Sequence, residues 1–515
     1  MALRDKFRNK FLFSQIKDIF IIIAIFVFIF IFILILNFFK TPDNNQEILQ
    51  QYKKIEEFFE QNPRQDQQEN IFSTQSENKV KIVFWHNLYP EEEKILAQVI
   101  KDFQKKYSNI EVLATNKGYW SQIIKSVTNS LPVNKQPHLV VSYPDHVESY
   151  FRSNKVVDLN HFIQFDQDYK ENIENQLFDI FKSEKNSPSY YLPFLKTTEI
   201  MFYNKAILKE IYSQCPELIN ENGEFKKSIL YWKDMETICQ LLKEKKPQSD
   251  FVPIIYESGA NLIILNYRQK IGLNNFPKND HEAELVLKDP HVLDDTIQYF
   301  AEHFYNKKYL STSDLNQQFT PLKELFLQQK SAMFISSSRR INNFFKINFE
   351  IGLSSIPIIE DNSPSSSEDT PKFFSQGSNI NLFYSPNIKE MIASWLFLKY
   401  LISSEVYQKF FDGKSGLCLT GNKLKEKLET RYSSPVEEVS LKHKKKIQID
   451  YEKFILQINQ NDFFIIPCFK NSFVFRILLQ ELFVRILSLE KTNPSIYKQN
   501  KKQLFDEAYQ RFRNF

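Results

Sequence analysis

The chain has 515 residues, and its 66 lysines and arginines nearly balance 62 aspartates and glutamates, for a net charge of +4. This small excess of positive charge does not indicate a nucleic-acid partner, and a chain of this length is expected to form at least two domains. The cysteines lack the spacing of zinc ligands, which argues against a metal site, whereas the sequence leaves a disulfide open. They are Cys215, Cys239, Cys418 and Cys468. Nothing in the sequence indicates a cofactor.

Residues 19–36, IFIIIAIFVFIFIFILIL, contain no polar side chain. As a helix they would extend roughly 27 Å, close to the hydrocarbon thickness of a bilayer. The preceding segment, 1–18, is basic, so the positive-inside rule puts it in the cytoplasm and the rest of the chain outside the cell. This predicts an uncleaved, single-pass signal anchor in the cell membrane. A cleaved signal peptide is the alternative, although NFFKTPD offers no small-residue cleavage site.

Residues 37–78 change in character. EILQQYKKIEEFFEQ is weakly amphipathic, and NPRQDQQENIFSTQSEN is polar, rich in glutamine and without a core pattern. The segment is therefore predicted to be a tether that holds an extracellular body near the membrane.

The body is predicted to open with a βαβ unit. Strands are expected over 80–85 and 110–115, with a helix between them that begins at Pro90 and carries glutamates in its first turn. A helix over 119–130 and a strand in PHLVVSY follow. Because ligands of open α/β sheets bind beyond the carboxyl ends of the strands, residues 85–87, 118–120 and 142–145 are candidates for a site.

The alternation of strands and helices continues to the end of the chain and predicts an α/β fold. Strands are expected in LPFLKTTEIMFYNK, FVPIIYES, SAMFISSS and NINLFYS. Helices are expected in YWKDMETICQLLKEK, DDTIQYFAEHFYNKK, IKEMIASWLFLKYLIS and NKKQLFDEAYQRFRNF, with EDNSPSSSEDTPK as a loop.

Several of these segments, in this order, resemble a known family. They are FWHNLYPEE, NKGYW, PHLVVSY, LPFLKTTEIMFYNK, YWKDM, KSAMFISSSRRINNF, SQGSNINLF, SWLFLKYLIS followed by KSGLCLTGN, and FVFRILLQEL. Over about residues 80–514 the chain resembles the extracellular solute-binding proteins of ABC importers, sugar-binding family 1. The branch that it resembles most binds glycerol 3-phosphate.

The resemblance implies a type II periplasmic-binding-protein fold, with two α/β lobes joined by hinge-crossing strands. The first lobe would comprise 79–193 and 374–425, and the second 194–373 and 426–515. A sugar or polyol phosphate would be enclosed between the lobes by hinge motion and passed to a permease that a separate ATPase drives. The chain itself has no GxxxxGK[ST] phosphate loop. Hinge closure within one chain predicts a monomer.

The resemblance also implies which residues bind the solute. A cleft for sugars or polyol phosphates needs an aromatic surface, neutral hydrogen-bonding groups and a cation. Trp120 matches the family's aromatic position after KG and is expected to stack on the ligand, with core packing as the alternative. Thr197 and Thr198 match paired hydroxyls of the segment that crosses between the lobes.

Three further groups of residues are candidates for ligand binding, and the first and the last of them could hold an anion. Ser337 and Ser338, before a helix, are expected to present backbone N–H groups, with a plain helix cap as the alternative. Gly377 and Ser378 match a place where the family brings its backbone close to the ligand. Arg476 matches an arginine that resembles the family's phosphate ligand, with a surface salt bridge as the alternative.

Two positions depart from the family pattern. An acidic residue of the family is Pro144 here, with Asp145 one place later, and a tyrosine of the family is Leu417. Asp145 is kept as a ligand-binding candidate. Both departures bear on whether glycerol phosphate itself is the cargo.

The sequence lacks the motifs of the common hydrolases. The eight histidines are scattered, and the sequence has no HExxH or GxSxG motif, so the chain is predicted not to be an enzyme. A non-transporting interaction or adhesion protein on the same fold is the alternative, as is a binding protein for an oligosaccharide or another solute. The run KHKKK over 442–446 could contact anionic lipid, although a solvated loop is the simpler interpretation.

Overall fold

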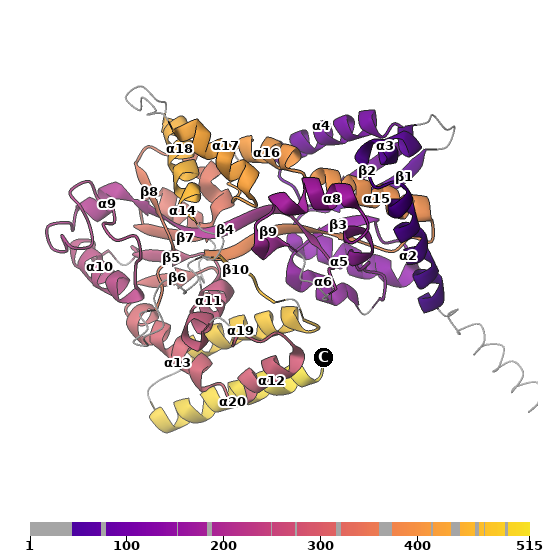
Figure 1. Ribbon diagram of the computed structural model, residues 1–515. Coiled ribbons are helices and arrows are strands. Elements are labelled where there is room, and N and C mark those ends of the chain that lie inside the picture. The colour runs from indigo at the N-terminus through magenta and orange to yellow at the C-terminus, as the bar shows by residue number, and fades with distance from the viewer. Residues whose placement is uncertain are drawn as a thin grey trace, which may run out of the picture. The chain divides into compact units, whose positions relative to one another are not determined.

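The fold is built on one mixed β-sheet of ten strands, which passes through both lobes (Figure 1). The computed structural model describes residues 44–73, 79–151, 153–182, 188–248, 250–272, 275–315, 321–359, 373–413, 416–433, 443–458, 463–467, 469–489 and 493–515. The chain divides into two units, residues 1–58 and 59–515, and the second unit contains the whole sheet. Of the first unit, only residues 44–58 are described, and they lie in helix α2 (Asn44–Gln61).

The predicted membrane anchor, residues 19–36, and the basic segment 1–18 lie outside the described residues. Within the described ranges, no helix is long and apolar enough to cross a membrane. The anchor therefore stays a prediction from the sequence.

The N-terminal lobe begins with the βαβ unit that the sequence predicts. Its parallel strands are β1 (Val80–His86), β2 (Ile110–Asn116) and β3 (Leu139–Ser142), with β1 in the middle. Its connecting helices are α4 (Pro90–Lys106) and α5 (Trp120–Ser130). Helix α15 (Ile388–Leu401), from much later in the chain, packs against β1. Because α15 is buried on almost every side, its sequence is apolar almost all round.

The C-terminal lobe is built around three more parallel strands. In order across the sheet they are β7 (Met333–Ser337), β5 (Ile254–Tyr256) and β6 (Leu310–Thr312). The helices of its core include α10 (Trp232–Lys245), α11 (Gly259–Ile271), α13 (His291–Phe300), α19 (Ser472–Leu487) and α20 (Pro494–Arg513). Trp232 is fully buried in this core, and its indole N–H donates to Asn266 Oδ1 at 2.7 Å, so its polar atom is satisfied.

Two antiparallel strands join the lobes. Strand β4 (Leu192–Asn204) pairs with β9 (Phe373–Leu382) through Thr198, and from Glu199 onward it pairs with β7. The chain therefore passes from one lobe to the other within β4. All thirteen residues of β4 are buried, because both faces of the strand are covered. The predicted crossing segment is thus found, and its polar residues lie in the interior.

The remaining elements connect or cover the sheet. They are α6 (Pro144–Phe151), α7 (Asn160–Ile163), α8 (Gln167–Asn172), α9 (Lys205–Lys209), α12 (Asp280–Lys288), a π-helical turn (Ala301–Tyr305), α14 (Leu322–Leu327), the 3₁₀ helix η5 (Ser338–Lys346), β8 (Ile351–Ser354), α16 (Ser404–Asp412), α17 (Asn422–Tyr432), α18 (His443–Leu456) and β10 (Phe463–Phe464). Figure 1 shows α16 and α18 on one side of the sheet, and α6, α11 and α19 on the other. The predicted loop at 360–372 lies outside the described residues.

Part of the segment predicted as a tether folds against the N-terminal lobe instead. Helix α3 (Gln65–Ser73) lies within residues 37–78, and its Gln68 is fully buried. Lys399 Nζ of α15 donates to Gln68 Oε1 at 2.8 Å and contacts Asp166 Oδ2 at 2.9 Å and Asp168 Oδ2 at 2.7 Å. A buried ammonium group needs such oxygen partners, because an unpaired buried charge is strongly unfavourable. The glutamine that looked like part of a linker is therefore a core residue.

Candidate functional site

The carboxyl ends of the strands in the two lobes point toward each other. Strands β3 and β4 are both antiparallel to β9, and β4 is antiparallel to β7, so the parallel strands of one lobe run against those of the other. In open α/β sheets this is the edge where ligands bind. Side chains from both lobes meet there, among them an ion pair and a group of aromatic rings.

The first contact between the lobes joins Arg339, at the start of η5, to Glu92 in the first turn of α4. Arg339 Nη2 donates to Glu92 Oε2, and the guanidinium lies 4.1 Å from the centre of the Tyr89 ring. The same carboxylate oxygen accepts the backbone N–H of Tyr89 at 2.9 Å, so Glu92 also caps its own helix. The side chains of Arg339 and Glu92 are only 12% and 4% exposed. The ion pair is therefore buried and links both lobes.

A second ion pair lies beside the first, at the ends of β5 and β7. Arg340 Nε donates to Glu257 Oε2 at 3.2 Å, and Nη2 of the same side chain donates to Glu257 Oε1. Ser336 Oγ also donates to Glu257. Because the guanidinium engages both carboxylate oxygens, this pair is bidentate, in contrast to that of Arg339.

The second polar group of the site centres on Glu199, where β4 enters the C-terminal lobe. Asn261 Nδ2 of α11 donates to Glu199 Oε1 at 2.6 Å, and the Tyr256 hydroxyl donates to Oε2 at 2.7 Å. Arg476 of α19 donates to Asn261 Oδ1, and its guanidinium lies 5.9 Å from the centre of the Phe374 ring. The arginine that the sequence proposed as an anion ligand is thus held by an amide whose other end binds a carboxylate.

Burial raises the pKa of Glu199 to about 7, against the opposing effects of the hydrogen bonds from Asn261 and Tyr256 and of the positive charge of Arg476. Glu199 as a residue is only 2% exposed. The carboxyl group of Glu199 therefore changes its charge in the range of neutral pH, and Asn261 connects it to Arg476. A glutamate in the middle of an apolar strand is the signal by which the sequence could have revealed it.

Aromatic side chains form the second contact between the lobes. The rings of Trp120 and Tyr143 lie 4.1 Å apart with 31° between their planes, and Trp120 meets His146 at 5.6 Å. His146 of α6 in turn meets Phe473 of α19 edge to face at 5.8 Å. Trp120 is half-buried, so part of its surface is open to a ligand.

An open depression lies where β2 ends and α5 begins. It has a volume of about 540 Å³, within the range of small-molecule sites. Its lining contains amides, a hydroxyl and two lysines but no carboxylate: Asn116, Lys117, Gly118, Gln122, Lys125, Ser126 and Asn129. Lys117 Nζ also lies 4.0 Å from the centre of the Trp85 ring. Of the predicted region 118–120, Gly118 therefore lines a polar depression.

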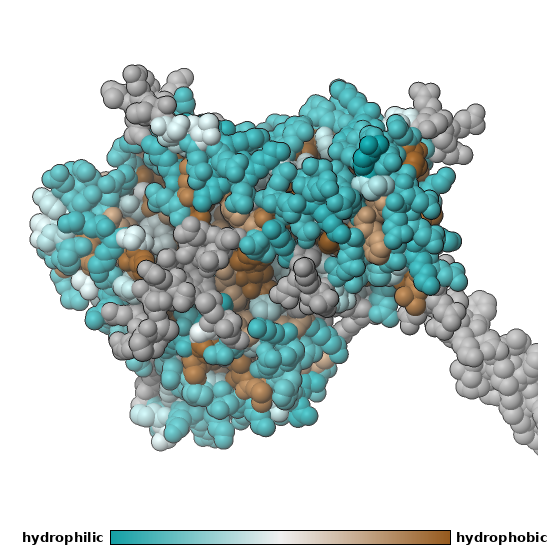
Figure 2. Space-filling model, in the orientation of Figure 1, coloured by the Kyte–Doolittle hydropathy of each residue, from teal (hydrophilic) through white to brown (hydrophobic). Residues whose placement is uncertain are grey.

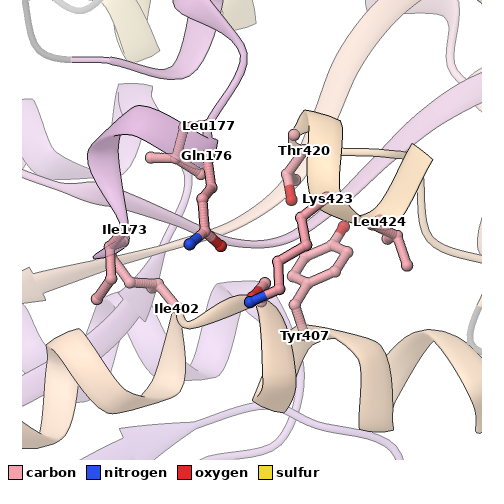
Figure 3. Close-up of a pocket in the computed structure, with 10 residues that line it drawn as sticks. Ile173, Gln176, Leu177, Ile402, Tyr407, Thr420, Lys423 and Leu424 are labelled. Atoms are coloured by element: carbon pink, nitrogen blue, oxygen red, sulfur yellow. The ribbon is translucent and has the colours of Figure 1, made fainter. Parts of the chain in front are cut away.

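Figure 3 shows a second pocket, away from the strand ends, between α16, α17 and the segment 173–177. It is lined in part by Tyr407, Thr420 and Lys423, and it encloses about 20 Å³. That is room for about one water molecule. This pocket is therefore too small for a sugar.

The hydroxyl groups of the crossing segment serve the structure. Thr198 Oγ1 donates to the carbonyl of Phe374 at 3.0 Å, and the backbone N–H of Thr198 donates to Ser338 Oγ at 3.2 Å. Ser338 Oγ donates to the carbonyl of Gly416 at 2.6 Å. Thr197 is buried opposite Gln376 of β9. Thr198 and Ser338 thus join the lobes to each other, while Ser337 is half-buried at the end of β7.

The backbone at Gly377 approaches another strand. Its φ is +88°, and a Cβ there would lie 2.1 Å from the carbonyl oxygen of Leu195 in β4. The absence of a side chain thus allows β9 to pair closely with β4 beside the register shift between Pro193 and Lys196. The approach of this backbone to a ligand stays a prediction. Ser378 is buried beside Gly377. The backbone of Asp145 lies in α6, but its side chain is outside what the structure describes.

A buried lysine lies on the face of β4 opposite Glu199. Lys196 Nζ donates to Asn379 Oδ1 at 3.2 Å, and it lies 5.8 Å from the centre of the Phe181 ring. Burial lowers the pKa of Lys196 to about 7. Within the described ranges, no carboxylate pairs with this lysine.

The described residues include no cluster of three or more histidine, cysteine, aspartate or glutamate side chains that could hold a metal ion. Cys215, Cys239 and Cys418 are buried free thiols, and Cys468 lies outside the described residues.

Sequence comparison identifies one family. The model of the family described as bacterial extracellular solute-binding protein matches residues 98–423, more than half of the chain. No curated protein sequence matches the chain.

Solved structures share the fold at low sequence identity. An ABC substrate-binding protein from Listeria monocytogenes in complex with cycloalternan is 14% identical, with a TM-score of 0.60 over 85% of this chain and 99% of that one. UgpB from Mycobacterium tuberculosis in complex with glycerophosphocholine is 12% identical, with a TM-score of 0.57 over 85% and 98%. A solute-binding protein from Agrobacterium radiobacter in complex with ribitol is 13% identical, with a TM-score of 0.58 over 85% and 100%. These likenesses support the two-lobe α/β fold.

Proposed function

Because the chain belongs to the bacterial extracellular solute-binding proteins, we propose that it captures a polyhydroxylated solute, a sugar or a polyol phosphate, between its two lobes. The family consists of substrate-binding proteins, so the chain is a binding protein and not an enzyme. The solute would pass to an ABC permease driven by a separate ATPase, as the family resemblance implies.

One observation carries this proposal: the half-buried Trp120 ring lies against Tyr143, and Trp120 follows by two positions Gly118, which lines a polar depression of about 540 Å³. An aromatic face binds the C–H surface of a sugar, and amide and hydroxyl groups bind its hydroxyls. Figure 2 shows that hydrophilic side chains cover most of one face of the molecule, with an apolar area gathered near its middle.

The charge of the solute depends on Arg476. A guanidinium group is the natural partner of a phosphate. Here it already donates to Asn261, which is bound to the buried carboxyl group of Glu199. This arrangement favours a neutral sugar or polyol over glycerol 3-phosphate. The bound ligands of the neighbours, cycloalternan, glycerophosphocholine and ribitol, span both chemistries.

The membrane attachment, the oligomeric state and the hinge of the protein are also part of the proposal. We propose that residues 19–36 anchor a monomeric extracellular body to the cell membrane, as their apolar sequence suggests. The lobes would hinge at β4 and β9, near the predicted boundaries 193/194 and 373/374. The change of β4 from pairing with β9 to pairing with β7 after Thr198 supports a hinge there.

A panel of solutes tests the proposal. The full chain would be titrated with mono-, di- and oligosaccharides, polyols and glycerol 3-phosphate while its thermal midpoint is followed, because a solute that binds only the folded state must raise that midpoint. We expect one chemical class to raise it. No shift across the panel, with a working control protein, would contradict the proposal and favour a non-transporting interaction protein.

A further inference from the structure

The ion pair between Arg339 and Glu92 is incomplete. A single guanidinium nitrogen, Nη2, contacts a single carboxylate oxygen, Oε2. Arg339 Nε and Glu92 Oε1 are both buried and have no hydrogen-bond partner among the described residues. A bidentate contact, such as the neighbouring one of Arg340 with Glu257, would have satisfied both atoms.

Such atoms are unusual in a folded protein, because a buried polar atom without a partner is strongly unfavourable. A third buried atom without a partner lies in the turn between β1 and α4. Asn87 is 9% exposed, and its Oδ1 is also buried and without a partner in the described part of the chain. One donor and two acceptors thus remain unsatisfied at the carboxyl ends of β1 and β7, where the two lobes touch.

The chemistry of the missing partner follows from these atoms. Arg339 Nε carries a hydrogen and can only donate, and Glu92 Oε1 as a carboxylate oxygen can only accept. A hydroxyl group does both, because it accepts with a lone pair and donates with its hydrogen. A phosphate would complement Arg339 but repel Glu92, and an ammonium group would have the opposite conflict.

We infer that Arg339 and Glu92 together bind a hydroxyl group of the solute and thereby make closure of the lobes depend on a hydroxylated ligand. The inference rests on the proposed function and extends it to two residues that lie within the segments FWHNLYPEE and KSAMFISSSRRINNF but were not among the predicted ligand-binding residues. Arg339 comes from the C-terminal lobe and Glu92 from the N-terminal lobe. A hydroxyl between them therefore bonds to both lobes at once, and this contact exists only while the lobes are closed.

Two conservative variants test the inference in the full chain. The probes are maltotriose, ribitol and glycerol 3-phosphate, and the affinity of each would be measured by calorimetry for the wild-type chain, Arg339→Gln and Glu92→Gln. One of these probes is expected to bind to the wild type. We expect its affinity for each variant to be lower by a factor of about ten or more, as for lost hydrogen bonds to charged groups. Lys501→Gln is the control, because its ion pair with Asp294 lies within one lobe, and it should bind like the wild type.

A deoxy analogue separates a ligand contact from a merely structural ion pair. Removal of the contacted hydroxyl from the probe should weaken binding to the wild type but not to the double variant Glu92→Gln/Arg339→Gln. This double variant also decides the question if a single variant fails to fold, because it leaves no unpaired buried charge.

The outcomes distinguish a failure of the inference about Arg339 and Glu92 from a failure of the proposed function. Equal affinity of a probe for the wild type, both single variants and the double variant would overturn the inference and leave the proposed function standing. Equal losses from the deoxy analogue in the wild type and the double variant would also overturn it. A wild type that binds none of the probes or panel solutes would overturn the proposed function, and the inference with it.

Discussion

Asn261 Nδ2 donates a hydrogen bond to Glu199 Oε1 at 2.6 Å, while Asn261 Oδ1 accepts one from Arg476. The amide therefore stands between a carboxyl group and a guanidinium group, with its donor end toward the first and its acceptor end toward the second. Each partner fixes the orientation of the amide, and the amide fixes Arg476. The position of the arginine at the lobe junction thus depends on a residue buried in β4.

The first prediction concerns the pH dependence of stability. Because burial raises the pKa of Glu199 from 4.5 to about 7, the folded state binds more protons than the unfolded state between these pH values. The contribution of Glu199 to stability is therefore greatest below pH 4.5 and falls as the pH rises to 7. We expect Glu199→Gln to remove this slope and to stabilise the protein at pH 7.5 by up to about 3 kcal/mol.

Urea unfolding of the wild type and of Glu199→Gln at several values from pH 4.5 to 7.5 measures this slope. An identical pH dependence in both proteins would show that Glu199 ionises normally in the folded state.

The second prediction concerns Lys196, whose effect on stability changes with pH in the opposite direction to that of Glu199. Burial lowers the pKa of Lys196 to about 7, so between pH 7 and 10.5 the folded state binds fewer protons than the unfolded state. Its unfavourable effect on stability is complete below pH 7 and disappears as the pH rises to 10.5. We expect Lys196→Met to stabilise the protein at pH 6 by on the order of 3 kcal/mol, and the gain to shrink at alkaline pH. Denaturant unfolding at pH 6 and pH 9.5 gives both values, and a constant gain would contradict the assigned cause.

The third prediction tests the aromatic surface. We expect Trp120→Ala to weaken binding of a panel sugar by a factor of ten or more, because its half-buried ring, which lies against Tyr143, offers an aromatic face to the sugar. The adjacent Tyr119 is 78% exposed, and Tyr119→Ala should leave the affinity within a factor of about three. Calorimetric titration compares the two, and equal effects would argue that Trp120 only packs against the lobe.

The fourth prediction concerns the close pairing of β9 with β4 at Gly377. Gly377 and Gly272 have similar positive φ values, +88° and +81°, but only Gly377 has backbone atoms within 3 Å of an added Cβ. We expect Gly272→Ala to destabilise by about 1 kcal/mol, from the φ value alone, and Gly377→Ala by at least about 3 kcal/mol. Thermal and urea unfolding measure both changes. Equal losses would show that the strands separate at little energetic cost.

The fifth prediction concerns helix α3. Gln68→Ala removes an oxygen partner of the buried Lys399 and should destabilise the protein by about 1–3 kcal/mol. Gln98→Ala, on the exposed face of α4, should change stability by less than about 0.5 kcal/mol. Urea unfolding of both variants compares the two positions. If the two changes were equally small, α3 would be a dispensable tether after all.

The α/β class and the order of most elements could be predicted from the sequence. The helix from Pro90, the helix up to Ser130 and the strands β1 to β3 lie where the sequence predicts them. These elements are set by local physics, since apolar spacing and first-turn residues act over a few positions along the chain. The ordered series of short motifs was likewise enough to identify the family.

The pairs of polar residues that contact one another became visible only in the folded chain. Gln68 hydrogen-bonds to Asp166 and Lys399 across 98 and 331 positions of the chain, so no local pattern distinguished it from a linker residue. Arg339 and Glu92 are separated by 247 positions and meet only because two lobes close on each other. Burial of a charged group and the identity of its partner depend on long-range packing, and therefore a single sequence does not reveal them.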